Sequence, residues 1–283
     1  MPGVRRLRCS RDPSGQKNLR LVTWNVNSVR QRLPLIERYI QEYSPDVLAL
    51  QEIKCQQNDF PAETFSKLGY HHVHLGQKSY NGVATLSKHP MTNVEFGLKG
   101  PEDDEHDPQA RYVQCSVQGI AICNLYHPNG NPVGSEKFDY RLRWSKLLYG
   151  RVKSLTQSDM PLVLMGDFNT VPRDEDCYDI IDLSSDAVVH PHCRSQYRSL
   201  VYQGLYDALQ IKPNKEKQYS YWDYRAGSWE KNKGMRIDHI LLSPHLADRF
   251  VQGGVHKEVR GWQGPSDHAP VWADIRRSDA MSD

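Results

Sequence analysis

Runs of apolar residues recur along the chain and end in polar residues, a pattern that predicts many short β-strands. The runs 47–50 and 162–165 contain no polar residue, which is typical of strands buried on both faces. Within 111–117, apolar residues instead alternate with polar ones, as in a half-buried antiparallel strand. Further strands are predicted at 19–24, 70–75, 82–87, 119–126, 237–242 and 269–275.

Apolar residues at helical spacing lie between these runs. Leu33, Ile36, Ile40 and Tyr43 mark one face of a helix that ends at 44–46. Further helices are predicted at 60–68, 136–156 and 196–209. Strands with short connections, interrupted by helices, indicate two packed sheets with helices outside, in one α/β domain.

The ends of the chain differ in composition from the part between them. We expect 1–18 to be a flexible basic extension and 278–283 a tail, which leaves 19–277 as the single folded domain. The segment 102–107 is an acidic loop, and 170–192 is a long irregular insert.

The composition excludes several classes of protein. The 283 residues are 38% hydrophobic and 25% charged, with a formal net charge of only +2, so a strongly basic non-specific nucleic-acid binder is excluded. The arginine-rich N-terminal segment is unlike a secretory signal, and no apolar run has membrane-spanning length, so we expect no membrane partner. Six cysteines without a CxxC pair predict reduced thiols in a cytoplasmic protein.

The segment 161–169 is the strongest candidate for a functional site. Asp167 and Asn169 follow a buried strand and lie two residues apart, so in an extended chain they point the same way. Together they could bind a hard cation, a phosphate oxygen or a water molecule. Gly166, Asp167 and Asn169 are also the residues of an ordinary turn, and this segment taken alone favours the turn.

Polar clusters at other strand ends favour the functional interpretation. If these ends converge, they form a pocket that contains four carboxylates, several amides, a phenol and an imidazole. Its members are Asn25, Asn27, Glu52, Tyr126, Asp167, Asn169, Asp238, Asp267 and His268. Carboxylate and amide oxygens select Mg²⁺ or Mn²⁺ over zinc, so the inventory suits metal-assisted phosphodiester hydrolysis.

The order of these motifs resembles exonuclease III and the abasic-site (AP) endonucleases. The resemblance covers 19–276 and rests on WNVNSVR at 24–30, LQEIK at 50–54, GQK at 76–78, GVA at 82–84, GDFN at 166–169, WDYR at 222–225, RIDH at 236–239 and PSDHAP at 265–270. It implies a four-layer α/β/β/α sandwich, Mg²⁺ dependence with Mn²⁺ as a substitute, and action on abasic sites and 3′ ends of duplex DNA. A monomer associated with the bacterial nucleoid is expected.

The resemblance also implies residue roles. Glu52 would be the principal metal ligand, with Asn25 close by and Asp267 contributing, and Asp167, Asn169 and His268 could form a second metal site. Asp167 would orient or deprotonate the attacking water, and Asn169 would hold the scissile phosphate. The remaining roles are a tyrosine near the phosphate, a histidine oriented by an aspartate, and substrate contacts. These fall to Tyr126, to His268 with Asp238, and to Asn27, Arg111, Tyr221 and Trp222.

Other interpretations remain open at this point. Tyr221 and Trp222 could be plain core, and the histidines at 71, 72 and 74 could form a metal cluster or lie on the surface of a strand. Basic residues such as Arg141 could hold phosphates or be solvated. His192 in the insert could obstruct a continuous strand, which predicts weaker abasic incision than 3′-end processing. The alternative functions are a phosphatase acting on inositol phosphates or lipids and an inactive DNA-binding module.

Overall fold

The computed structural model describes residues 18–100, 107–213 and 216–277. The predicted basic extension, except for its last residue, and the predicted tail lie outside the described residues, as does most of the acidic loop. Among the described helices, none combines the length and the apolar composition that a membrane span requires.

Two six-stranded sheets form the centre of the molecule, with strand orders β11-β12-β1-β2-β4-β3 and β5-β6-β7-β8-β10-β9. The strands are β1 (Leu19–Asn25), β2 (Val47–Gln51), β3 (His71–Leu75), β4 (Val83–Ser87), β5 (Met91–Phe96), β6 (Tyr112–Val117), β7 (Ile120–Tyr126), β8 (Leu162–Asp167), β9 (Tyr206–Asp207), β10 (Asp238–Leu242), β11 (Phe250–Val255) and β12 (Val271–Ile275). Among the strands of the described residues, only β1–β2 and β7–β8 pair in parallel, so both sheets are mixed.

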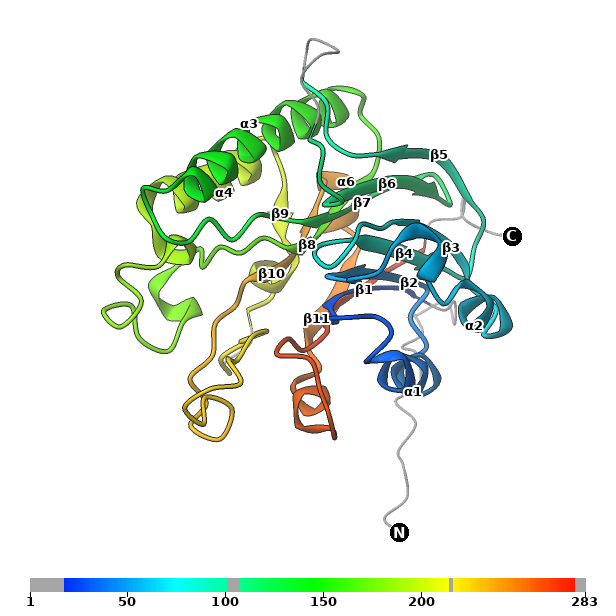
Figure 1. Cartoon of the computed structure of the whole chain (residues 1–283). Helices are drawn as coiled ribbons and strands as arrows, with labels where there is room; N and C mark the ends of the chain where they lie inside the picture. Colours follow the sequence, from blue (N-terminus) through cyan, green and yellow to red (C-terminus); the bar gives the residue numbers. More distant parts are fainter. Residues whose placement is uncertain (1–17, 101–106, 214–215, 278–283) are drawn as a thin grey trace.

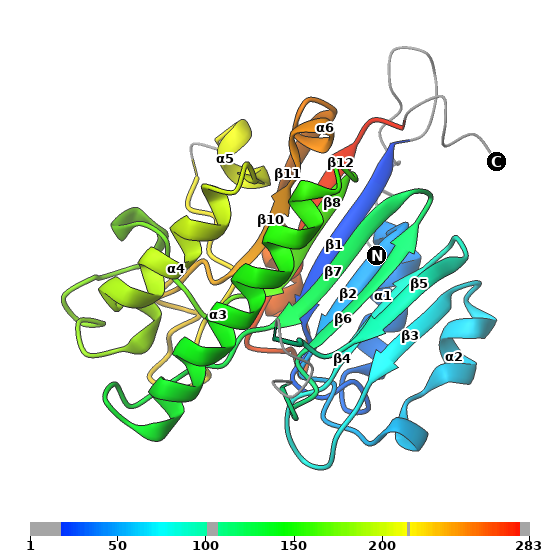
Figure 2. The same ribbon diagram turned by 90° about the horizontal axis from the view of Figure 1, so that it is seen from above.

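The helices lie outside the two sheets (Figure 1, Figure 2). They are α1 (Leu33–Tyr43), α2 (Ala62–Lys67), α3 (Glu136–Gln157), α4 (Pro191–Val201), α5 (Ala208–Ile211) and α6 (Pro244–Ala247). A buried apolar cluster with residues from both sheets, among them Val47, Ile122 and Val163, fills the space between them. Separate clusters join α1 to the first sheet and α3 to the second. These layers confirm the predicted four-layer sandwich.

The structure corrects the boundaries predicted for the elements that follow residue 169. The predicted insert contains two short 3₁₀ turns, Asp174–Asp176 and Ala187–Val189, and α4 already begins at its end. Residues 196–209 are not one helix, because α4 ends at Val201 and is followed by β9 and α5. Further along the chain, Tyr221 forms isolated β-bridges with Met235 and His268.

Gly166 explains how the central strand reaches the site. β8 lies between β7 and β10, and a Cβ atom at Gly166 would lie 1.9 Å from the carbonyl oxygen of Leu125 on β7. A non-bonded carbon cannot approach a backbone oxygen so closely. Only glycine therefore allows β7 and β8 to pair beside Asp167, the last residue of β8.

We predict that Gly166→Ala lowers the free energy of unfolding by about 3 kcal/mol or more, because β7 and β8 must separate to admit the methyl group. Gly150→Ala is the matched control. Gly150 is an exposed residue within α3 whose added Cβ would meet nothing within 4 Å. The control should be stabilised by about 0.5–1 kcal/mol. Urea denaturation followed by circular dichroism measures both changes, and equal stability of the two variants would contradict the close approach.

Candidate active site

The predicted polar strand ends do converge on one edge of the two sheets. Asn25 ends β1, Tyr126 ends β7, Asp167 ends β8 and Asp238 begins β10. β7 and β8 are parallel and β10 is antiparallel to β8, so Tyr126, Asp167 and Asp238 are consecutive neighbours in the register. Asn25 belongs to the other sheet, and its Nδ2 atom donates to Oδ2 of Asp167 over 3.0 Å. The site therefore spans the junction between the sheets.

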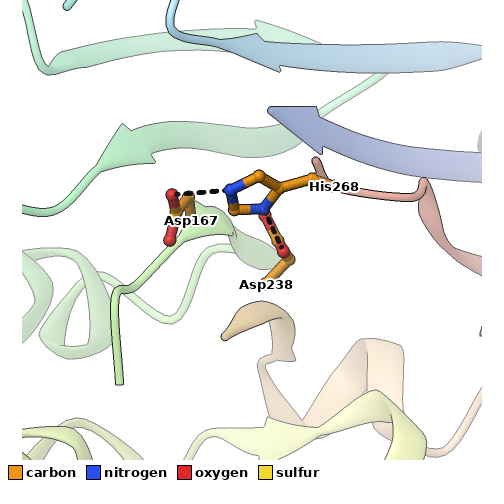
Figure 3. Close-up of side chains that lie close together, drawn as sticks. All are labelled: Asp167, Asp238 and His268. Atoms are coloured by element: carbon orange, nitrogen blue, oxygen red, sulfur yellow. Dashed lines mark hydrogen bonds and ion pairs between the residues drawn. The ribbon is translucent and has the colours of Figure 1, made fainter. Parts of the chain in front are cut away.

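Asp238, His268 and Asp167 form a chain of buried ionisable groups (Figure 3). Nδ1 of His268 lies 2.8 Å from Oδ2 of Asp238, and Nε2 lies 3.8 Å from Oδ2 of Asp167. The hydroxyl of Ser220 donates to the same oxygen of Asp238 over 2.6 Å. These contacts fix the imidazole ring with its Nε2 atom directed towards Asp167.

The surroundings of His268 and Asp167 raise the pKa values of both groups. Burial alone would lower the pKa of His268, but the charge of Asp238 and its hydrogen bond, followed by Asp167 and Asp267, raise it to about 10. Burial raises the pKa of Asp167 to about 7, with a further contribution from the charge of Asp238. At neutral pH His268 is therefore an imidazolium, and Asp167 can accept a proton.

Glu52 lies beside this chain and collects hydrogen-bond donors. Its Oε1 atom accepts from Nδ2 of Asn25 and from the phenol of Tyr126, both over 2.9 Å, and its Oε2 atom lies 2.8 Å from Nζ of Lys54. Burial alone would raise the pKa of Glu52, but Lys54 and the hydrogen bonds lower it. Burial raises the pKa of Tyr126, and the negative charges of Glu52 and Asp167 raise it further. Its phenol therefore keeps its proton and acts as a donor.

The amide side chains have defined orientations. Nδ2 of Asn169 donates to the carbonyl of His127 over 2.9 Å, and Oδ1 accepts from Asn129 over 3.2 Å, which leaves one amide hydrogen for a phosphate oxygen. Asn25 directs its Nδ2 atom, not its oxygen, at the carboxylates, while its Oδ1 atom accepts from the backbone N–H of Asn27. Direct metal ligation by Asn25 would require this amide to rotate.

Two groups of residues could hold a metal ion. Asp167, Asp238 and His268 offer ligand atoms within 4.8 Å of one another, and Oδ1 of Asp238 has no hydrogen-bond partner in the described part of the chain. Glu52 and Asp267 offer only oxygen atoms, which suits a hard cation. The ammonium group of Lys54 against Glu52 shows that positive charge is already stabilised there.

The substrate contacts expected from the sequence differ in their placement. Asn27 lies within the site, where it donates to Asp267 over 3.1 Å and accepts from Lys54 over 2.6 Å. Arg111 lies over the ring of Tyr126, 4.7 Å from its centroid, and remains partly accessible. The ring of Tyr221 contacts that of His268 at 5.0 Å.

The placement of Trp222 does not agree with the substrate contact that we expected of it. It is 0% exposed, packs among Tyr219, Trp229 and Ala269, and donates to Asn232, so it cannot touch a substrate directly. Tyr221 and Trp222 differ in this way because consecutive residues in an extended segment point to opposite sides.

Some contributors were missed from the sequence. Neither Ser220, which donates to Asp238, nor Asn129, which donates to Asn169, lies in a motif that indicates these contacts. The histidines of β3 form no metal cluster with other ligands in the described residues; the ring of His74 stacks on Phe60, and its Nε2 atom lies 3.0 Å from the carbonyl of Gln57.

Comparisons with known proteins agree with this geometry. The model of the endonuclease/exonuclease/phosphatase family matches residues 22–268. Exodeoxyribonuclease III of Haemophilus influenzae is 34% identical over 271 residues, which cover 91% of this chain and 100% of that protein. A structure of the 3′ phosphatase NExo from Neisseria, bound to a product DNA hairpin, superposes with a TM-score of 0.87 at 38% identity and covers 92% of this chain and 100% of that one.

An AP endonuclease from Archaeoglobus fulgidus gives a TM-score of 0.86 at 34% identity, covering 91% of this chain and 99% of that one. Both the sequence relatives and the structural neighbours thus extend over nearly the whole described domain. The chain therefore belongs to the endonuclease/exonuclease/phosphatase family, in its branch of exonuclease III and AP endonucleases.

Proposed function

We propose that this protein is a Mg²⁺-dependent DNA-repair nuclease that hydrolyses phosphodiester bonds of duplex DNA at 3′ ends and abasic sites. The observation that carries the proposal is the chain of Asp238, His268 and Asp167, in which one imidazole lies between two buried carboxylates. This chain places a proton acceptor and a fixed positive charge side by side, as attack by water on a phosphate diester requires.

Asp167 is the residue that receives the proton of the attacking water. Its two oxygen atoms accept from the backbone N–H of Asn169 and from Nδ2 of Asn25, so the carboxylate has one orientation. A pKa raised to about 7 by burial makes it a stronger base than an exposed aspartate, and still ionised in part at neutral pH.

His268 and Asn169 are positioned to bind the phosphate. The imidazolium of His268 donates to Asp238 through Nδ1, which leaves Nε2 to donate to an oxygen on which negative charge develops. The free amide hydrogen of Asn169 can donate to the same group. Tyr126, with its proton retained, can hydrogen-bond the phosphate or the leaving oxygen.

Glu52, with Asp267, is the pair that would hold the metal ion. The ion itself would polarise a phosphate oxygen and neutralise charge. The oxygen-only donor set favours Mg²⁺, with Mn²⁺ as a substitute. Asp167 and His268 are less suited as ligands in this arrangement, because the imidazolium of His268 already lies between the carboxylates of Asp167 and Asp238.

The wider organisation belongs to the same proposal. Residues 19–277 act as one catalytic domain, supported by the pairing of the first strand, β1, with the last, β12. The five described cysteines are free and buried, which supports work in a reducing compartment such as the bacterial cytoplasm. We propose a monomer that meets its DNA in the nucleoid.

One assay tests the function directly. The protein is incubated with Mg²⁺ and three duplexes, which carry an internal abasic site, a recessed 3′ end or a 3′-phosphate, and parallel reactions contain EDTA. We expect cleavage only with the metal. Release of phosphate from inositol phosphates with no action on DNA would replace the proposal by the phosphatase alternative, and DNA binding without cleavage would indicate an inactive module.

The same duplexes test the balance of activities predicted from the insert. His192 is exposed in the first turn of α4, and its ring contacts that of His190. Tyr221, by contrast, packs against the apolar cluster that contains Val188. If His192 obstructs a continuous strand, His192→Gly should raise the ratio of abasic incision to 3′-end release. An unchanged ratio, with both activities intact, would remove His192 from this role.

We predict that Glu52→Gln raises the Mg²⁺ concentration needed for half-maximal activity by about 10-fold or more, because a charged ligand is lost. Glu63→Gln is the control, since Glu63 forms only an exposed ion pair with Lys67 on α2. A Mg²⁺ titration of the initial rate, alongside thermal unfolding, separates ligand loss from misfolding. Full activity of Glu52→Gln at limiting Mg²⁺ would exclude Glu52 as the ligand.

We predict that Asp238→Asn lowers activity and moves the alkaline limb of the pH–rate profile to lower pH. The charge of Asp238 raises the pKa of His268 to about 10, so its removal lets the imidazolium lose its proton at a lower pH, with an expected shift of at least about one unit. Asp159→Asn is the matched control, because Asp159 pairs with His245 on the surface. If both variants kept the parent profile, His268 would not act as a cation.

A further inference from the structure

Arg141 is a fully buried arginine on α3 whose guanidinium group contacts the site from behind. It is 0% exposed, so it cannot reach a DNA phosphate, and within the described residues it forms no ion pair with a carboxylate. Its hydrogen bonds run instead to neutral oxygen atoms. Nη1 donates to the carbonyls of Pro128 (2.8 Å) and Asn129 (2.7 Å), and Nη2 donates to the carbonyl of Asn169 (2.8 Å) and to Oγ1 of Thr170 (2.6 Å).

These four acceptors belong to two separate segments. Nη1 holds the loop that follows β7, and Nη2 holds the turn that follows β8. Because a guanidinium group is planar and rigid, the two segments are held at one spacing and in one orientation. A lysine ammonium group, which is a point charge on a flexible stem, cannot impose this geometry.

The same two segments orient the amide of Asn169. Its Nδ2 atom donates to the carbonyl of His127, and its Oδ1 atom accepts from Nδ2 of Asn129. Both partners are in the loop that Nη1 holds, and the backbone of Asn169 is in the turn that Nη2 holds. A shift between the two segments would therefore turn the amide away from the phosphate position.

Close packing of the loop over the arginine supports the same conclusion. Gly130 has a φ angle of +84°, and a Cβ atom there would lie 2.6 Å from Cδ of Arg141. The loop thus lies directly on the arginine stem, without space for a side chain. A buried cation without a carboxylate partner is poor evidence of a purely stabilising role, because desolvation opposes its burial.

We propose that Arg141 is a positioning residue of the hydrolytic reaction, which sets the orientation of the Asn169 amide by joining the 127–130 loop to the 169–170 turn. The inference rests on the phosphodiester hydrolysis proposed above. Arg141 acts through Asn169 and does not touch the substrate itself.

The first test compares Arg141→Lys and Arg141→Met with Arg151→Met, a control on the same helix whose guanidinium binds Glu95 and Gln114. All variants are assayed below their unfolding temperatures on the recessed duplex with Mg²⁺. We expect kcat to fall about 100-fold for Arg141→Met and to recover only in part in Arg141→Lys, with KM changed less than kcat. Arg151→Met should keep the parent kcat.

Two outcomes would overturn the proposal. A parent-like kcat in both Arg141 variants would leave Arg141 with a structural role alone. Full recovery by lysine would show that the buried charge matters, rather than the geometry of the guanidinium. A parent protein without activity on DNA would instead refute the proposed function, so the two failures are distinguishable.

The second test asks whether the effect passes through Asn169. In a double-mutant cycle under single-turnover conditions, Arg141→Lys should lower the rate much less in an Asn169→Ala background than in the parent. Additive effects would contradict the proposal. If the Arg141 variants fold poorly, Thr170→Val removes one acceptor of Arg141 together with the hydrogen bond that the hydroxyl donates to the carbonyl of Phe168 over 3.0 Å. It should lower kcat several-fold, whereas Thr170→Ser keeps the hydroxyl and the rate. Equal rates for these two variants would also contradict the proposal.

Discussion

Two carboxylates that are almost completely removed from water share one imidazole, and the architecture of the site follows from the requirements of that arrangement. Asp167 and Asp238 would repel each other strongly in a desolvated environment if His268 were neutral. The imidazolium between them relieves the repulsion. Burial, with the charge of Asp238, raises the pKa of Asp167, and the charge of Asp238 raises the pKa of His268 against the effect of its own burial. Removal of either carboxylate would change the protonation of the remaining pair, so base strength and positive charge in this site are set together.

Such an arrangement needs a rigid frame, which the strand ends supply. Asp167 and Asp238 are direct partners in the β8–β10 register, and Asn25 joins them to the other sheet. Asn27, Glu52 and Asn169 all have φ angles between +46° and +48°, so the backbone turns sharply at three site residues. Residues other than glycine rarely adopt this left-handed backbone conformation, and they keep it only where surrounding contacts hold them. The hydrogen bonds of Asn169 provide such contacts.

The periodicity of the chain predicted most of the sheets, because residues with a buried face must alternate or run continuously apolar. It failed for β5, β9 and β11, all of which are edge strands. β5 is largely exposed and carries a register shift, and β9 has two residues, so neither has a periodic signal. β11 contains Gly253 and Gly254, which weaken a strand pattern further. Aromatic residues gave an ambiguous signal for a related reason: Tyr221 reaches the site and Trp222 does not, although the two are adjacent.

The sequence by itself determined the two-sheet architecture and the identity of the polar residues that gather at its edge, since both depend on local patterns of burial and on motif order. Only the tertiary structure decided which atoms of those residues meet. It showed that Asn25 directs its amide nitrogen at the carboxylates and that Lys54 pairs with Glu52. It also showed that Arg141 is buried and donates hydrogen bonds to two backbone segments, rather than being a surface charge. The physical reason is that these contacts join residues far apart in the chain. Their geometry depends on the packing of two sheets and a helix, and no local pattern encodes it.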